Sequence, residues 1–231
     1  VPLRGSSGSL RAAILPHMNV IIVSDTVCPW CFVGKRRFER ALAERPQITL
    51  DIEWRPFQLN PQMPAEGLDR KTYMRAKLGS DEQAKEIYQA IEQAGDAENI
   101  PFAFDAMTRV PNTVASHRLI SWSLQFGRQD SVVEGLFRCY FEDGKDIGDI
   151  DVLAAAAGEA GLDEADAAAY LASDEGVEQT ITESQEAQQR GISGVPCFIF
   201  DGKYAVSGAQ GPEVFAQVFD LALQPDDAAS G

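Results

Sequence analysis

The chain has 231 residues, of which 45% are hydrophobic, so it is long enough to bury a sizeable core as one domain or two. Its net charge of -15 argues against nucleic acid or an anionic membrane surface as the principal partner. No apolar run approaches the roughly 18 residues that a membrane span needs, and four scattered cysteines do not make the disulfide framework of a small secreted protein.

The first seventeen residues are expected to lie outside the fold. They are rich in Gly and Ser, end just before Met18 and resemble a remnant of cloning. If Met18 is the natural start, the first cysteine follows ten residues later and leaves no room for a secretory signal peptide. We therefore expect a cytoplasmic protein, and a periplasmic one only if a signal peptide has been removed.

A strand, a helix and a second strand open the predicted fold. Residues 19–24 form a β-branched apolar run that is typical of a strand buried on both faces. A helix is predicted from Pro29, a residue favoured in the first turn, to about Glu44. Residues 48–57 alternate apolar and polar side chains, which predicts a half-buried strand and completes a βαβ unit.

Two cysteines, Cys28 and Cys31, stand three positions apart at the start of this helix. The N–H groups and the dipole of a helix N-terminus stabilise a thiolate, which is the nucleophilic form of cysteine, and Cys28 occupies that place. Cys31, one turn later, is within reach to close a disulfide or to resolve a mixed one. Structural zinc and two inert thiols stay as alternatives, and Ser24, Asp25 and Thr26 are expected to cap the helix.

Helix signals dominate residues 65–190, where strand signals almost disappear. Ser80 and Gln83 form a capping box for a helix that ends near Gly95, and Asn112 is expected to cap another that ends near Gly127. Further helices are predicted at about 129–142, 151–160, 164–172 and 174–190.

Strand signals return after Gly191. Two short apolar runs flank Asp201-Gly202, which predicts a hairpin, and a helix then opens with Pro212. We therefore predict a mixed α/β fold in which residues 18–64 and 191–231 form one domain, interrupted by an all-helical insertion at 65–190.

Val195-Pro196 opens the first of these returning strands. A cis bond at this place would turn the backbone of Val195 so that its N–H and C=O could pair with an extended substrate. An ordinary trans proline at a strand edge is the alternative.

Three motifs together resemble one protein family: "SDTVCPWCFVGKRRFE", "PNTVASHRLI" and "GVPCFIFDGKYAVSGAQGPEVF". Their order and spacing are similar to those of the FrnE-like branch of the DsbA family, over nearly all of Met18 to about Leu223. The resemblance implies a thioredoxin fold (βαβ…ββα, mixed sheet) with a DsbA-like helical insertion. Several members of this branch are cytoplasmic or lack an evident export signal.

The resemblance also implies roles for individual residues. Cys28 would be the attacking thiol, Cys31 the resolving thiol and Pro196 the cis-proline that faces them. Pro29 and Trp30 would be the intervening dipeptide that tunes the redox potential.

Other residues receive weaker assignments. The resemblance places the helix of Asn112 and His117 over the active-site groove, so both are candidate substrate-binding residues together with Val195. A packed or capping role is the alternative for His117. Cys197 is either a core residue, which we favour, or an accessory thiol, and Cys139 is expected in the core.

These assignments predict a thiol-disulfide oxidoreductase, either a protein disulfide oxidase or isomerase or a reductase. It would use a redox-active Cys28-Cys31 disulfide and no bound cofactor or metal. Its substrates would be protein or small thiols and disulfides, its recycling partner is undetermined, and glutathione stays open as a redox partner.

Two other functions are weighed. Glutathione-dependent enzymes of the 2-hydroxychromene-2-carboxylate isomerase and kappa type share the scaffold but usually have Ser where Cys28 stands. The turn that holds glutathione in them corresponds to Gly208-Ala209-Gln210, which lacks their hydroxyl and carboxylate. The minor alternative is a chaperone-like module that binds peptide and does not use its thiols.

Overall fold

The computed structural model describes residues 17–78 and 81–222. The first strand begins at His17, inside the segment that we excluded from the fold, and His17 pairs there with Thr49. The remainder of that segment and the predicted capping box at Ser80 lie outside the described residues.

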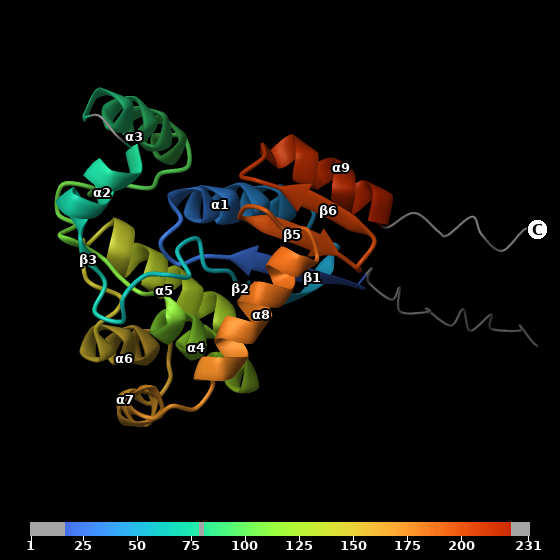
Figure 1. Ribbon diagram of the computed structural model, residues 1–231. Helices are drawn as coiled ribbons and strands as arrows, with labels where there is room; N and C mark the ends of the chain where they lie inside the picture. The colour runs from blue at the N-terminus through green and yellow to red at the C-terminus, as the bar shows by residue number, and fades with distance from the viewer. Residues whose placement is uncertain (1–16, 79–80, 223–231) are drawn as a thin grey trace, which may run out of the picture.

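A four-stranded mixed sheet forms the centre of the molecule, in the order β2-β1-β5-β6 (Figure 1). β1 is parallel to β2 and antiparallel to β5, and β5 is antiparallel to β6. This mixed sheet confirms the predicted βαβ…ββα order. The strand bounds are β1 (His17–Ser24), β2 (Thr49–Pro56), β5 (Cys197–Phe200) and β6 (Tyr204–Ser207).

Two helices, α1 (Pro29–Ala43) and α9 (Pro212–Ala222), cover one face of the sheet. Phe38 of α1 lies at the centre of an aromatic cluster, with ring centroids 5.4 to 6.3 Å from those of its neighbours. The neighbours are Phe198 and Phe200 of β5 and Phe215 and Phe219 of α9. These buried rings hold α1, whose start lies next to Cys28 and which contains Cys31, against the strand that follows Pro196.

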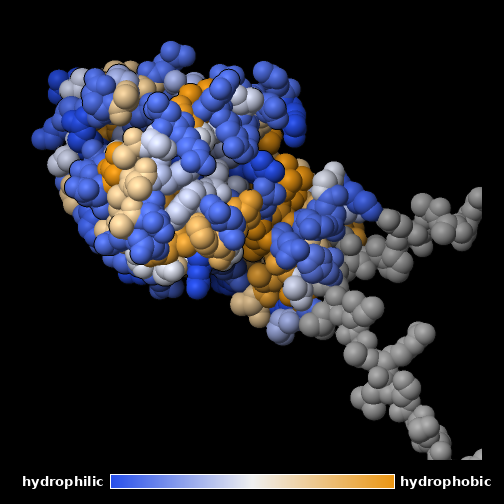
Figure 2. Space-filling model, turned by 90° about the horizontal axis from the view of Figure 1, so that it is seen from below, coloured by the Kyte–Doolittle hydropathy of each residue, from blue (hydrophilic) through white to orange (hydrophobic). Residues whose placement is uncertain are grey.

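The opposite face of the sheet is partly open. Helix α8 (Val177–Gln189) packs along β2. Beyond it, side chains of β1 and β5 such as Ile21 and Ile199 line a cleft of about 530 Å³. Seen from below, apolar surface gathers on this side of the molecule (Figure 2).

Between β2 and β5 the chain is mainly helical, as predicted. The helices are α2 (Arg70–Leu78), α3 (Asp81–Asp96), α4 (Val114–Ser123), α5 (Gln129–Phe141), α6 (Ile150–Glu159), α7 (Glu164–Ala172) and α8. A short 3-10 helix, Leu124–Phe126, continues α4 to Gly127, whose φ of 65° ends it where the sequence indicated. The domain boundaries at residues 64/65 and 190/191 stay predictions.

Two strands that the sequence did not predict also lie in this region. β3 (Leu68–Asp69) and β4 (Arg109–Val110) form an antiparallel ladder of two residue pairs. Strands of two residues are too short to give a period-two pattern, so their pairing depends on tertiary contacts alone.

The predicted cap of α4 is displaced by one residue. Thr113 occupies the N-cap position and makes no side-chain cap hydrogen bond. The side chain of Asn112 still accepts a hydrogen bond from the N–H of Val114, at 2.9 Å, from one position further out. The neighbouring prediction, a turn at Asp201-Gly202, is confirmed: both residues have positive φ, and the Lys203 N–H donates to the carbonyl of Phe200.

Candidate active site

Cys28 is the N-cap residue of α1 and Pro29 is its first helical residue. Our expectation that Ser24, Asp25 and Thr26 cap this helix through their side chains is wrong, because no side chain forms a hydrogen bond at the cap. The Cys28 N–H donates instead to the backbone carbonyl of Asp25, at 3.0 Å. The tight turn that results leaves the side chains of residues 24–26 available for other contacts.

Cys28 and Cys31 are both free thiols, and their side chains are hydrogen-bonded to each other. Cys31 is 1% exposed, compared with 5% for Cys28. Burial, together with the neighbouring Cys28, raises the pKa of the Cys31 thiol well above its usual range, and this outweighs hydrogen bonds from the Ser24 side chain and the Asp25 backbone. Cys31 is therefore a protonated thiol at neutral pH, sheltered behind Cys28.

The carbonyl of Val195 lies directly in front of the first thiol. Cys28 Sγ donates to the Val195 carbonyl oxygen at 3.7 Å, across a separation of 167 residues. The Val195-Pro196 bond is cis, and Pro196 is buried. Among residues 17–78 and 81–222, the Val195 N–H has no hydrogen-bond partner. The structure thus brings together Cys28, Cys31, Val195 and Pro196, four of the residues that the sequence indicated.

Gly34 allows α1 to approach this proline closely, a role that no local pattern of residues indicates. A Cβ on Gly34 would lie 2.8 Å from Pro196 Cγ, whereas one on Gly135, in the middle of α5, would meet nothing nearer than 3.8 Å. Contacts under 3.0 Å force a shift, and the buried proline ring has little room to move. Gly34 therefore sets the distance between the cysteine helix and the strand opened by Pro196.

Replacing Gly34 by alanine is expected to destabilise the protein by about 1–3 kcal/mol, because overpacking against Pro196 outweighs the helix propensity of alanine. The matched change Gly135→Ala should instead stabilise it by about 0.5–1 kcal/mol, since only the propensity gain remains. Urea unfolding of both variants measures the difference. If both substitutions changed the free energy of unfolding equally and with the same sign, contact with Pro196 would not be what restricts residue 34 to glycine.

A buried polar pair lies behind the cysteine loop. Asp25 is 1% exposed and His117, on α4, is 3% exposed, and His117 Nε2 lies 3.3 Å from Asp25 Oδ1. The same nitrogen is 3.2 Å from the Phe57 carbonyl, and the Leu59 N–H donates to Asp25 Oδ2 at 2.8 Å. His117 therefore contacts the side chain of a residue in the loop that leads to Cys28, with almost no exposure to solvent.

Thr26 and Ser116 join the same two segments, with their hydroxyl oxygens 2.7 Å apart in the interior. Sequence reasoning noted Asp25 and Thr26 only as caps and missed Ser116. Their partners lie about ninety residues away in the chain, so local patterns could not reveal them.

Two further predicted site residues, Asn112 and Trp30, differ in their exposure and contacts. The Asn112 side chain donates to the Met63 carbonyl at 2.7 Å and also accepts from the start of α4, so it joins two loops. Trp30 is 36% exposed and stands beside the pair as one of the exposed large apolar side chains of the described chain. An extended partner that reached Cys28 would therefore meet the indole of Trp30.

The basic residues that follow the pair on α1 are neutralised by carboxylates. Lys35, 2% exposed, forms ion pairs with Glu39, Asp130 and Glu134. Arg36 pairs with two of the same carboxylates. These cations join α1 to α5 and add little field at the thiols, in agreement with their distance from the helix start.

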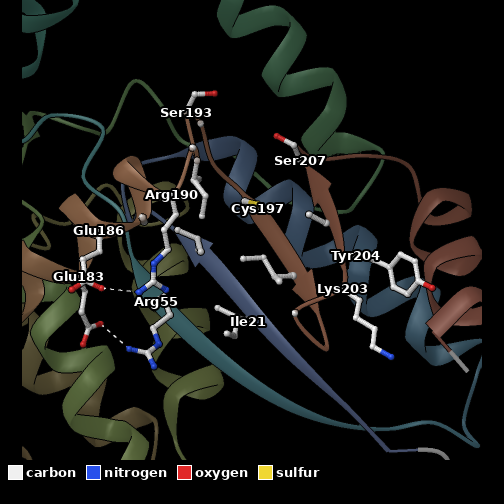
Figure 3. A pocket seen from close by; sticks show the side chains of 18 residues that line it. Ile21, Arg55, Glu183, Glu186, Arg190, Ser193, Cys197, Lys203, Tyr204 and Ser207 are labelled. Carbon is white, nitrogen blue, oxygen red and sulfur yellow. Dashed lines mark hydrogen bonds and ion pairs between the residues drawn. The ribbon is translucent and has the colours of Figure 1, made fainter. Parts of the chain in front are cut away.

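Cys197 faces away from the pair. Side chains alternate along β5, and Phe198 points toward α1, so Cys197 points to the other face of the sheet. It packs in a separate apolar cluster with Val23 and Phe57. Figure 3 shows Cys197 among the side chains that line the cleft of that face.

The reactivity of the four thiols should differ strongly. Burial raises the pKa values of Cys31, Cys139 and Cys197, whereas Cys28 stands at the helix N-terminus. At about pH 7.5 we expect iodoacetamide to alkylate Cys28 at least about tenfold faster than any of the other three. Peptide mass spectrometry of the reduced protein after short pulses measures the order. Faster labelling of Cys31 would reverse the assignment of attacking and resolving thiols.

The described residues contain no group of three or more His, Cys, Asp or Glu side chains arranged to hold a metal ion. Within the same ranges, no helix combines the length and the apolar character that crossing a bilayer requires.

Comparison with known proteins gives a consistent result. Residues 19–220 match the family of the DSBA-like thioredoxin domain. The chain is 34% identical to a probable DsbA oxidoreductase, SCO1869 from Streptomyces coelicolor, whose crystal structure superposes with a TM-score of 0.78. That match covers 92% of this chain and 95% of the other.

More distant structures share the fold. A 2-hydroxychromene-2-carboxylate isomerase is 15% identical, with a TM-score of 0.66, over 88% of this chain and 94% of its own. The cytosolic disulfide reductase DsbM from Pseudomonas aeruginosa, solved with GSH, is also 15% identical, with a TM-score of 0.62, over 89% and 98% of the two chains.

Proposed function

Because the chain belongs to the family of the DSBA-like thioredoxin domain, we propose that it is an enzyme that exchanges thiols and disulfides through Cys28 and Cys31. The observation that carries the proposal is the contact of Cys28 Sγ with the Val195 carbonyl, next to the cis bond to Pro196. A peptide laid along Val195 as an extra strand would have its own disulfide within reach of Cys28.

The reaction that this arrangement supports has two exchanges. The Cys28 thiolate attacks one sulfur of a substrate disulfide, so that a mixed disulfide forms and the other sulfur leaves as a thiolate, which takes up a proton. Cys31 then loses its proton and attacks Cys28 Sγ, which releases the second substrate thiol. Two electrons have passed to the substrate and the pair is oxidised, and the reverse sequence donates a disulfide.

Each assigned residue has a part in this scheme. Cys28 attacks and Cys31 resolves, while Pro196 and the backbone of Val195 bind the substrate. Pro29 and Trp30 set the redox potential.

Asn112 and His117 were also predicted to bind substrate. His117 is only 3% exposed and contacts Asp25, so its proposed role is to position the loop that leads to Cys28. A direct contact of His117 with substrate stays a prediction. A substrate contact of Asn112 stays a prediction.

We also propose a branch of the family, a location and a class of substrate for the protein. The motifs around Cys28, Asn112 and Pro196 favour the FrnE-like branch, with Cys-Pro-Trp-Cys as its redox-active disulfide. A cytoplasmic location agrees with that resemblance and with the cytosolic DsbM. Protein or small thiols and disulfides would be the substrates, without a bound cofactor or metal, and glutathione is a candidate redox partner because DsbM was solved with it.

The alternative function, a glutathione-dependent isomerase, has less support. Its structural representative shares only 15% identity with this chain, which indicates the fold alone. Cys28 stands where those enzymes usually have Ser, and Gly208-Ala209-Gln210 lacks the groups that hold glutathione in them.

Peptide mapping after exchange tests the proposal. The reduced protein is mixed with oxidised glutathione or with insulin, and the products are trapped with acid. We expect a Cys28-Cys31 disulfide and an equivalent amount of new substrate thiol. A Cys139→Ala, Cys197→Ala double variant should give the same yield and serves as the control, because Cys139 is buried in α5 and Cys197 points to the face of the sheet opposite Cys28. A disulfide that involves Cys139 or Cys197, or no exchange at all, would contradict the assignment.

A further inference from the structure

The buried cations of the described chain differ in how their charges are compensated. Lys35, Arg70 and Arg118 are each 9% exposed or less. Lys35 has three carboxylate partners, and Arg118 donates to four backbone carbonyls. The Arg70 side chain makes one hydrogen bond, from Nε to the Phe104 carbonyl at 3.4 Å, and no ion pair with any carboxylate in residues 17–78 or 81–222. An Arg so buried is normally paired.

Two aromatic rings hold the Arg70 guanidinium in place. Its central carbon lies 5.0 Å from the ring centroid of Tyr88, on α3, and 5.7 Å from that of Phe104. The two rings are themselves in contact, with centroids 4.8 Å apart. These cation–π contacts offset part of the cost of burial, but they leave the N–H groups of the two terminal nitrogens without acceptors.

Those terminal nitrogens are not fully buried, and Arg70 lines an open cleft. No fully buried side-chain nitrogen or oxygen in the described residues lacks a hydrogen-bond partner, so the unpaired nitrogens of Arg70 are not sealed in the interior. Arg70 lines a cleft of about 920 Å³ between α2 and α3, which lie side by side in Figure 1. A buried guanidinium without an ion pair, at the wall of a cleft, can donate hydrogen bonds to an anionic ligand that enters the cleft.

The remaining lining gives the cleft its character. Three further cations surround it, in a chain whose net charge is -15: Lys71, Arg75 and Lys85. Apolar side chains form part of the wall: Met74, Tyr88, Phe104 and Met107. Three carboxylates also line it, Asp69, Glu92 and Asp105, and Asp69 is already engaged by the backbone N–H and the hydroxyl of Thr72.

We propose that this cleft is a binding site for a small organic anion: a carboxylate attached to an apolar or aromatic body. The two carboxylate oxygens would accept hydrogen bonds from the terminal nitrogens of Arg70 in the bidentate geometry that a guanidinium favours. The body would lie against Tyr88 and the methionines, and the volume suits a small molecule.

This site is separate from the thiol site. Cys28, Cys31, Val195 and Pro196 are not among the residues that line it. Binding there can therefore be measured with both thiols blocked, independently of disulfide exchange.

Calorimetric titration with phenylbutyrate tests the proposal. The protein is first alkylated at its accessible thiols. We expect phenylbutyrate to bind the wild type with Kd below about 10 mM, and Arg70→Met to weaken it at least about tenfold. The neutral amide of phenylbutyrate should bind about tenfold more weakly than the acid, and acetate should also bind more weakly because it lacks the apolar body. The matched control is Arg190→Met, which removes an exposed guanidinium elsewhere and should not change the affinity.

A second measurement does not depend on a variant that folds. In the wild type, the Arg70 Nε–H signal in a ¹⁵N-correlated NMR spectrum should shift on addition of phenylbutyrate and should not shift with the amide. Equal binding of acid and amide, equal affinity in Arg70→Met and wild type, or no heat and no shift at about 10 mM would each overturn the proposal.

Discussion

Replacing Cys28 by serine is expected to abolish disulfide exchange. A hydroxyl in this place is not ionised near neutral pH and cannot form a mixed disulfide, so no covalent intermediate can arise. The rate of insulin disulfide reduction should fall by about 10³-fold or more, which corresponds to roughly 4 kcal/mol of barrier. The change replaces one sulfur by an oxygen at a residue that makes no side-chain cap, so the fold should be unaffected.

Cys31→Ser is the matched control, because it makes the same atomic change one helical turn further on. Cys28 still attacks in this variant, but no thiol resolves the product, so a mixed disulfide should accumulate and be visible as an added mass on Cys28. Wild-type turnover in Cys28→Ser would refute the proposed function. Accumulation of the adduct on Cys31 in the Cys28→Ser variant would instead exchange the two roles.

Lys35→Met is expected to cause the largest loss of stability among the charged residues near the site. The Lys35 side chain is 3% exposed and pairs with Glu39, Asp130 and Glu134. Removing the ammonium leaves Glu39 and Glu134 paired with Arg36, and Asp130 with the indole N–H of Trp54 in place of a cation. We expect the free energy of unfolding, measured in urea at neutral pH, to fall by about 3 kcal/mol.

The same substitution at Lys145 provides the comparison. Its ammonium pairs with Asp143 at 3.0 Å, and both side chains are about half exposed. Because solvent screens such a pair, Lys145→Met should change the free energy of unfolding by less than about 1 kcal/mol. Equal losses in the two variants would mean that burial does not strengthen the Lys35 network.

The effect of Lys35→Met should also depend on pH. Burial acts to raise the pKa of Glu134, but Arg36 and Lys35 outweigh it and hold that pKa below its usual range. A carboxyl whose pKa is lower in the folded state contributes stability above its unfolded pKa and loses it as the pH falls through the folded value. The difference between wild type and Lys35→Met should therefore be largest at neutral pH and shrink below about pH 4, in urea titrations at several pH values.

Several features could be predicted from the sequence because their causes are local. The run that became β1, the proline that starts α1 and the Asp201-Gly202 turn each follow from the conformations that neighbouring residues allow. The resemblance of three motifs to one family then placed the two halves of the sheet together. That step needed the order of the motifs along the whole chain, because periodicity does not specify which strands pair.

Other features depended on contacts between distant residues. The capping roles expected for Asp25 and Thr26 were wrong because their partners, His117 and Ser116, belong to a helix far along the chain. The two-residue strands β3 and β4 were missed for the same reason, since their pairing joins segments about forty residues apart in the chain.

By itself, the sequence determined the order of the elements, the two cysteines at a helix start and the proline that follows Val195. Only the tertiary structure decided which groups surround them. It placed the Val195 carbonyl 3.7 Å from Cys28, turned Cys197 to the other face of the sheet and left Arg70 buried with no carboxylate partner among the residues that the structure describes. The physical reason is that burial and hydrogen bonding depend on which distant segments pack together, and a local pattern of side chains carries no record of that packing.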